Sequence, residues 1–188
     1  DQKLGQTEKV HRKAKNFLEL FTVLSVGFIL LSKEVYQVYV GKDFWQGTIL
    51  IPVFVSSYYL NFLCTFPVNY EYYHKKTKVV AIVTILSSLV NIVLNWVLIH
   101  AIGMAGAAIA TMLSHTLQLT MHYVYVRYML GGRDYPFGIK LWLRYALGYM
   151  AAVLFVLLSW NLGLIRWALG GVLGIWELLR IKRRKVLI

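Results

Sequence analysis

Cysteine, proline and acidic residues are scarce in this sequence of 188 residues. The single cysteine, Cys64, excludes an internal disulfide and argues against a cysteine-based metal site. Only eight Asp and Glu residues accompany twenty Lys and Arg, and none falls at the centre of a long apolar stretch. Because paired or clustered carboxylates are the usual basis of metal binding and acid–base catalysis, we predict no metal site, no cofactor and no enzymatic activity.

Apolar residues are abundant instead. They make up 59% of the chain, charged residues only 15%, and the mean hydropathy is +0.59. A soluble domain of this length cannot bury that much apolar surface in one core. The sequence therefore predicts an all-α integral membrane protein, and the net charge of +12 indicates lipid headgroups and membrane topology rather than nucleic acid.

Six stretches are long and apolar enough for transmembrane helices, which need about 20 residues each. We predict them at 16–32, 48–67, 79–100, 104–128, 141–160 and 162–179.

The Lys and Arg residues test this arrangement independently. If residues 1–15 lie in the cytoplasm, the successive connections alternate between the two sides of the membrane. Only three of the twenty cations, Lys33, Lys42 and Arg166, then face outward. The positive-inside rule predicts such an asymmetry, so we expect both ends of the chain in the cytoplasm.

The predicted segments divide into five regions. Residues 1–15 form a basic cytoplasmic linker, 16–128 four transmembrane helices, 129–140 a cytoplasmic loop, 141–179 two further helices, and 180–188 a basic cytoplasmic tail. The helices of 141–179 carry few polar residues in their centres and are expected to be peripheral. Because the chain begins at Asp1 with a polar, basic stretch rather than a signal peptide, we expect it to be part of a longer protein.

Polar residues inside the predicted helices recur at helical spacing. Such residues are costly in hydrocarbon unless they find a partner or face water. The sets at 84–95 and 111–122 each follow i, i+4, i+7, i+11, which places each set on one helical face. The residues that we predict to line a hydrated cavity are Ser57, Asn61, Ser88, Asn91, Asn95, Thr111, His115, Gln118 and His122. Hydrogen bonding between packed helices is an equally open interpretation of the same pattern.

Small residues recur on two of the predicted helices. Such ridges let helix backbones approach closely, and we expect packing within one bundle rather than dimerisation. The residues concerned are Gly103, Gly106, Ala110, Ser114, Gly170 and Gly174. Gly103 and Gly106 also flank a very short connection, which predicts a tight antiparallel hairpin.

Three charged residues lie near predicted helix ends. Glu19 and Glu177 are expected to pair with Lys or Arg or to reach the cytoplasmic interface, and Arg166 is expected to contact headgroups at the outer face.

The segment NIVLNWVLIHAIGMAGAAIATMLSH, residues 91–115, resembles the C-terminal domain of polysaccharide biosynthesis exporters. These belong to the multidrug/oligosaccharidyl-lipid/polysaccharide exporter superfamily. The residues that match the family pattern are Asn91, Leu94, Asn95, Gly103, Gly106, Ala107, Ala108, Ala110, Thr111 and Ser114. The similarity covers roughly residues 14–128, and the last two helices are similar to the extra pair of fourteen-helix members.

This resemblance implies a six-helix C-terminal bundle of a two-lobed transporter with 12–14 helices. It implies a flippase that moves undecaprenyl-diphosphate-linked oligosaccharide from the inner to the outer leaflet of a bacterial cell (inner) membrane for O-antigen, capsule or exopolysaccharide assembly. The implied partners are membrane lipid, the lipid-linked oligosaccharide, an N-terminal lobe and other polysaccharide assembly proteins, with no nucleic acid. Cationic residues commonly hold the diphosphate in such proteins, and the helix centres here offer only His115 and His122.

Other functions stay open. A multidrug antiporter of the same superfamily would need buried carboxylates for ion coupling, and the predicted helix centres have none. A membrane polysaccharide polymerase or glycosyltransferase would carry catalytic residues on a sizeable external loop, but the longest one, 33–47, lacks paired carboxylates. A structural membrane subunit would not require two aligned polar stripes.

Overall fold

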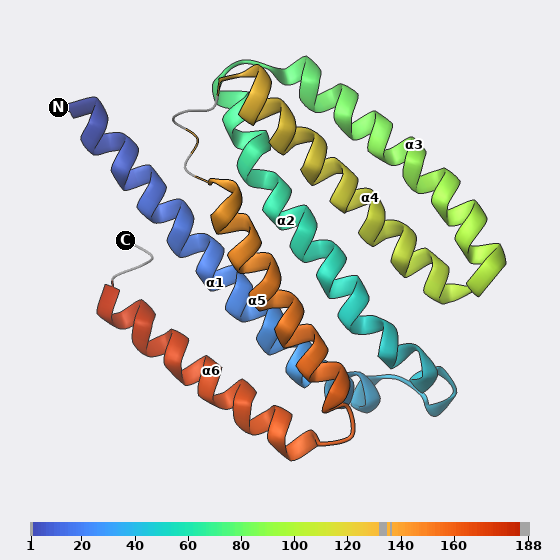
Figure 1. The fold of residues 1–188 in the computed structure, drawn as a ribbon. Helices are drawn as coiled ribbons and strands as arrows, with labels where there is room; N and C mark the ends of the chain where they lie inside the picture. Colours follow the sequence, from blue (N-terminus) through green and yellow to red (C-terminus); the bar gives the residue numbers. More distant parts are fainter. Residues whose placement is uncertain (1, 132–134, 136, 185–188) are drawn as a thin grey trace. The chain divides into compact units, whose positions relative to one another are not determined.

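A computed structural model describes residues 2–131, 135 and 137–184, with side chains from residue 9 to residue 183 of these ranges (Figure 1). The chain divides into two compact units. Unit 1 comprises Asp1–Ile49 and Pro136–Ile188, and unit 2 comprises Leu50–Tyr135. All six predicted helices form, so the all-α class is confirmed.

Unit 1 is built around a long first helix. α1 (Gln2–Tyr39) packs against both α5 (Ile139–Leu158) and α6 (Gly163–Arg184), although these last two lie more than a hundred residues further along the chain. Leu18, Ile29 and Leu30 of α1 and Val156 of α5 are almost fully buried. A 3-10 helix, η1 (Lys42–Leu50), follows α1. Nearness along the chain therefore does not decide which helices pack together.

Unit 2 is a three-helix bundle in which α4 packs against both neighbours. α2 (Ile51–Tyr73) and α3 (Thr77–Ile102) each contact α4 (Met104–Val124), and α4 continues into a short π-helix, η2 (Tyr125–Met129). The polar side chains predicted to line a cavity all lie on these three helices. Unit 2 therefore holds the whole predicted site.

The turn between α2 and α3 is closed by a recognisable C-terminal cap. The amide N–H of Lys76 donates to the carbonyl oxygen of Glu71 (2.9 Å), and the N–H of Lys75 donates to that of Tyr72 (2.9 Å). Lys75 adopts a positive φ of 57°. These bonds are those of a Schellman motif, in which a left-handed residue reverses the chain just after a helix.

Among the residues that the structure describes, four helical segments are long and apolar enough to cross a membrane: α1, η1 together with α2, α3, and α5. α4 and α6 form as helices too, but His, Gln, Arg and Glu side chains lower their mean hydropathy. Six spans were predicted, and by length and composition four of them are borne out. The membrane class is confirmed at that level.

The distribution of polarity is inverted relative to a soluble protein. Large apolar side chains such as Ile92 (64% exposed) and Trp96 (70% exposed) of α3 face outward. Buried positions include the charged or titratable residues Glu71, His122 and Arg166. A surface rich in contiguous apolar side chains is unstable in water and favourable in hydrocarbon, which is typical of a membrane protein.

Helix lengths differ from the predicted apolar stretches. α1 begins at Gln2 and ends at Tyr39, whereas the apolar stretch was 16–32. α6 runs to Arg184, so residues 180–184 of the predicted tail continue the helix. Hydropathy detects only the part of a helix that suits hydrocarbon, and Lys, Arg, Gln and Glu extend helices readily because they lose little rotamer freedom. The residues of the tail beyond 184 lie outside the described residues, as do 132–134 and 136 of the predicted loop.

Candidate functional site

The α3–α4 hairpin is closed by two glycines. Gly103 joins the helices with a positive φ of 63°, a conformation that glycine adopts without strain. A Cβ atom at Gly106 would overlap the backbone carbonyl of Leu98, so only glycine allows this approach of the two helices. Ala108 and Ala110 are fully buried. The small residues of the predicted ridge therefore form the contact between helices.

The predicted polar stripe of α3 meets the small-residue ridge of α4 within this hairpin. Asn91 Nδ2 donates to Ser114 Oγ (3.1 Å), and the Ser114 hydroxyl donates to the carbonyl of Ala110 (2.8 Å). Asn95 Nδ2 donates to the backbone oxygen (2.9 Å) and the side-chain oxygen (3.0 Å) of Asn91. Here polar residues hydrogen-bond between packed helices, which is one of the two interpretations that the sequence left open.

A second polar contact joins α2 to α4. His115 Nδ1 donates to the carbonyl oxygen of Ser57 (2.8 Å). The Ser57 side chain is fully buried, and its hydroxyl donates to the carbonyl of Val53 (2.9 Å). Ser57 and His115 therefore fix the two helices side by side.

The remaining predicted residues are less enclosed. Asn61 and Ser88 are exposed, Thr111 and Gln118 are half-buried, and the hydroxyl groups of Ser88 and Thr111 donate to carbonyls of their own helices (2.9 Å each). The structure therefore joins Asn91 to Ser114 and His115 to Ser57. Asn61, Ser88 and Gln118 take no part in these two contacts.

The most enclosed polar contact of unit 2 is the hydrogen-bonded pair of Glu71 on α2 and His122 on α4. His122 Nδ1 lies 2.8 and 3.0 Å from the two carboxylate oxygens of Glu71, and both side chains are 0% exposed. His122 Nε2 has no hydrogen-bond partner among the described residues. An ionisable side chain buried away from water needs such a partner, and ionisable residues inside a membrane commonly mark functional positions.

Sequence reasoning missed Glu71 because the predicted helix ended at Pro67. α2 continues through Pro67 to Tyr73, since neighbouring helices tolerate proline inside a membrane helix. One signal could have found Glu71: it lies fourteen residues after Ser57, which is the same face of an uninterrupted helix. Tyr135 packs edge-on to Tyr70 nearby (ring centroids 5.3 Å apart), and its burial, with Glu71 among the charges near it, raises the pKa of its phenol far above the usual range.

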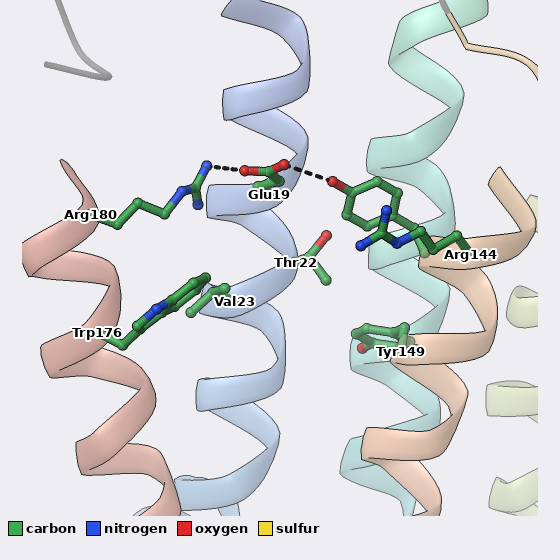
Figure 2. A pocket seen from close by; sticks show the side chains of 9 residues that line it. Glu19, Thr22, Val23, Arg144, Tyr149, Trp176 and Arg180 are labelled. Atoms are coloured by element: carbon green, nitrogen blue, oxygen red, sulfur yellow. Dashed lines mark hydrogen bonds and ion pairs between the residues drawn. The ribbon is translucent and has the colours of Figure 1, made fainter. Parts of the chain in front are cut away.

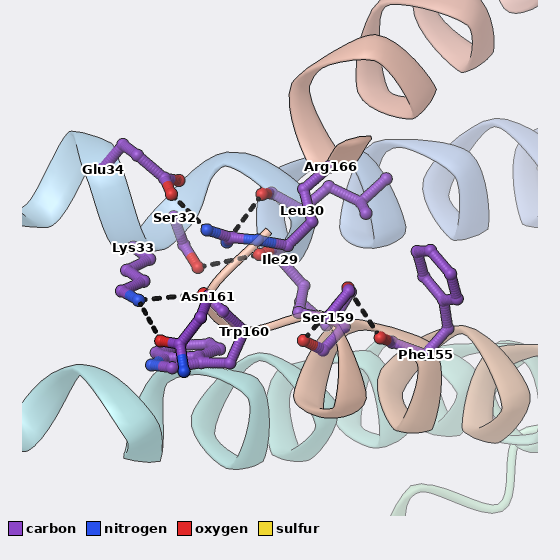
Figure 3. A network of polar contacts seen from close by, with 11 residues as sticks. Ile29, Leu30, Ser32, Lys33, Glu34, Phe155, Ser159, Trp160, Asn161 and Arg166 are labelled. Carbon is purple, nitrogen blue, oxygen red and sulfur yellow. Dashed lines mark hydrogen bonds and ion pairs between the residues drawn. The ribbon is translucent and has the colours of Figure 1, made fainter. Parts of the chain in front are cut away.

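Unit 1 holds a separate polar network where α1 meets the start of α6 (Figure 3). Arg166 is fully buried, pairs with Glu34 and donates to the carbonyl of Leu30 (3.2 Å). Lys33 Nζ donates to the carbonyl of Trp160 (2.8 Å). The prediction that Arg166 contacts headgroups is therefore wrong in this structure. The side chain is buried, and Glu34 of α1 supplies its acidic partner.

A second network joins α1, α5 and α6 at their other end (Figure 2). Arg180 Nη1 donates to both oxygens of Glu177 (2.8 Å each), Arg180 Nη2 contacts Glu19, and Tyr145 donates to Glu19 (3.1 Å). The prediction that Glu19 and Glu177 pair with a cation is confirmed. α6 buries two arginines against α1, and it leaves large apolar side chains such as Leu164 (89% exposed) and Leu178 (69% exposed) uncovered, in keeping with a peripheral helix.

The two glycines of the predicted ridge on α6 have different surroundings. A Cβ at Gly170 would lie 3.2 Å from Leu31 Cδ2, so Gly170 permits the close approach of α1 and α6. A Cβ at Gly174 would meet no described atom within 4 Å. Only Gly170 therefore packs against a helix of this chain in the structure.

A pocket of about 400 Å³ opens beside the second network. Glu19, Thr22 and Val23 line it from α1, Trp176 and Arg180 from α6, and Arg144, Tyr145, Gly148 and Tyr149 from α5 (Figure 2). No protein-family model, curated protein or solved structure matches this chain. The function must therefore be argued from the residues and their geometry.

Proposed function

We propose that this chain is part of a membrane transporter that flips a lipid-linked oligosaccharide across a bacterial cell membrane. The observation that carries the proposal is the α3–α4 hairpin. Its sequence resembles the polysaccharide exporters, and the small and polar residues of that pattern are the ones that close the turn, pack the helices and bond across them. The role of each residue in the hairpin gives a physical reason for the pattern.

The distribution of charge supports a protein that crosses the bilayer. In the described part of the chain, four helical segments are long and apolar enough to span it, and large apolar side chains cover the outside of α3. The predicted topology gathers seventeen of twenty cations on one side. Transporters built from such helices move polar cargo past the bilayer midplane by changing the packing of helical units.

The division of polar side chains within unit 2 suggests where the cargo would pass. Asn91, His115 and His122 are engaged in contacts between helices. Asn61 is exposed and Gln118 is half-buried, so their amides can contact a sugar without breaking such a contact. We therefore assign the cargo contacts to Asn61 and Gln118 rather than to the histidines.

The test uses the protein in its own bacterium. Deleting its gene should abolish the surface polysaccharide and leave lipid-linked oligosaccharide on the inner leaflet, and the wild-type gene should restore export. A strain carrying Asn61→Leu with Gln118→Leu should stay defective at normal protein abundance. Thr120→Val is the matched control, because Thr120 is exposed on α4 and its hydroxyl donates to its own helix (2.8 Å).

Two outcomes would contradict the proposal. Normal polysaccharide in the deletion strain would refute the flippase function. Normal polysaccharide in the double variant would refute the assigned contacts while leaving the flippase function in place.

One observation favours a second candidate, a cation-coupled drug antiporter. Such proteins need a buried carboxylate, and Glu71 is fully buried and paired with His122. An antiporter would move cationic dyes out of cells in exchange for an ion, and Glu71→Gln would abolish this exchange. Dye efflux that is unchanged by deleting the gene would exclude this candidate.

A further inference from the structure

The pocket between α1, α5 and α6 has no part in the proposed transport path, because its lining comes entirely from unit 1. Its volume of about 400 Å³ lies within the range of small-molecule sites. Figure 2 shows Trp176 and Arg180 of α6 on one side of α1 and Arg144 and Tyr149 of α5 on the other. The cavity is therefore a cleft whose floor is α1.

The charges of the lining leave one cation available. Arg180 is 7% exposed and occupied by Glu177 and Glu19. Arg144 is exposed and makes no hydrogen bond or ion pair with any residue that the structure describes. A free guanidinium at the rim of a cavity is suited to a phosphate group, which it can bind through two parallel hydrogen bonds.

The rest of the lining is suited to an amphipathic ligand. Val23, Trp176 and Tyr149 present apolar surface, and Tyr145 and Glu19 supply polar atoms near Arg144 and Arg180. Trp and Tyr gather at membrane interfaces because one end of each ring tolerates water. By the predicted topology this end of unit 1 faces the cytoplasm, where the exposed cations Lys140, Lys182 and Arg183 also lie.

We propose that the pocket binds the headgroup of one zwitterionic phospholipid of the inner leaflet, with its phosphate on Arg144. One free guanidinium matches one phosphate. A net-negative headgroup would place uncompensated charge beside Glu19, whereas the ammonium of phosphatidylethanolamine is attracted to that carboxylate. The apolar walls take the first part of the acyl chains. The site requires a membrane and does not depend on the transported cargo.

Purified protein in detergent, titrated with short-chain phosphatidylethanolamine and observed by native mass spectrometry, tests the assignment. Wild-type protein should bind one lipid per chain. Arg144→Gln should weaken binding about tenfold to a hundredfold, because glutamine cannot replace the charge-assisted hydrogen bonds of the guanidinium. Lys140→Gln is the matched control, because Lys140 is an exposed cation one turn earlier on α5 and does not line the pocket.

A second pair of variants tests the cavity itself. A Cβ at Gly148 would meet no described atom within 4 Å, so Gly148→Leu should fill the pocket without disturbing the helix and should abolish binding. Gly174→Leu on α6 has equally open surroundings but lies outside the pocket lining, and should bind like the wild type.

Several results would overturn the proposal. Equal affinity of Arg144→Gln and wild type would exclude the phosphate contact, and equal losses in Lys140→Gln would indicate only a general charge effect. Phosphatidylglycerol binding as tightly as phosphatidylethanolamine would exclude selection of a zwitterion. Displacement of the lipid by low millimolar inorganic phosphate would identify a free-anion site instead of a lipid site.

Discussion

Replacing Glu71 by methionine should destabilise the packing of the three helices of unit 2 strongly, so that the unit opens more often. The two side chains of the Glu71–His122 pair are 0% exposed, and Nε2 of His122 has no partner among the described residues. Glu71→Met removes the partner of Nδ1 as well, so His122 becomes a buried polar ring without any hydrogen bond. Removing one partner from a buried pair of ionisable side chains in this way costs about 3–5 kcal/mol.

The assay uses the only cysteine of the chain. Cys64 lies on α2, seven residues before Glu71, and is 3% exposed. A membrane-permeant maleimide can reach this thiol only when unit 2 opens, so the labelling rate follows the opening equilibrium if labelling is slower than reclosing. A loss of about 3–5 kcal/mol should raise that rate roughly a hundredfold to several-thousandfold.

Two further variants separate the ion pair from simple loss of volume. Glu71→Gln keeps an oxygen that accepts from His122, so the rate should rise only about fivefold, the effect of about 1 kcal/mol. The double variant of Glu71→Met with His122→Leu leaves no unpaired polar group and should label within about tenfold of the wild type. If the double variant labels as fast as Glu71→Met alone, or if Glu71→Met labels like the wild type, the reasoning is refuted.

Three further changes should give measurable effects in the purified protein in detergent. Gly106→Ala should destabilise unit 2 by about 1–3 kcal/mol because its Cβ overlaps the Leu98 carbonyl, and Cys64 labelling should accelerate. Lys75→Gly should stabilise the α2–α3 turn by about 0.5–1 kcal/mol, since glycine adopts the positive φ there without cost, and labelling should slow. Arg166→Leu should lower the thermal unfolding temperature of the protein by leaving Glu34 without its buried partner, whereas Arg166→Leu with Glu34→Leu should recover most of the loss. An unchanged labelling rate for either of the first two, or no recovery in the third, would contradict the packing described.

The sequence predicted the number and order of the helices well, because hydropathy and the spacing of Gly103 and Gly106 are local signals. It could not predict that α1 packs with α5 and α6. Arg166 and Glu34 are 132 residues apart, and no periodic pattern links positions at that separation. The predicted topology does place both residues at the outer ends of their helices. Comparing the depth of charged residues in the membrane would therefore have suggested Glu34 as a partner for Arg166.

The polar stripes illustrate a second limit. The spacing of Asn91 and Asn95 places both on one face of α3, and Ser114 belongs to the small-residue ridge of α4, but neither pattern says whether its face meets water or another helix. The choice depends on the partner helix, and Gly106 decides it here by bringing α3 and α4 into contact. Glu71 was missed for a related reason. Proline usually signals the end of a helix in a sequence, and only the packed bundle keeps α2 continuous past Pro67.

The length of α1 has a mechanical consequence. Its 38 residues span about 57 Å at the usual rise per residue, almost twice the thickness of the hydrocarbon layer. Its polar N-terminal part therefore projects from the bilayer as a rigid helix rather than as a flexible linker. A force applied to that projecting part would tilt α1 as a rigid body. The tilt would strain the ion pairs of Glu19 and Glu34, which lie at opposite ends of the buried part of α1.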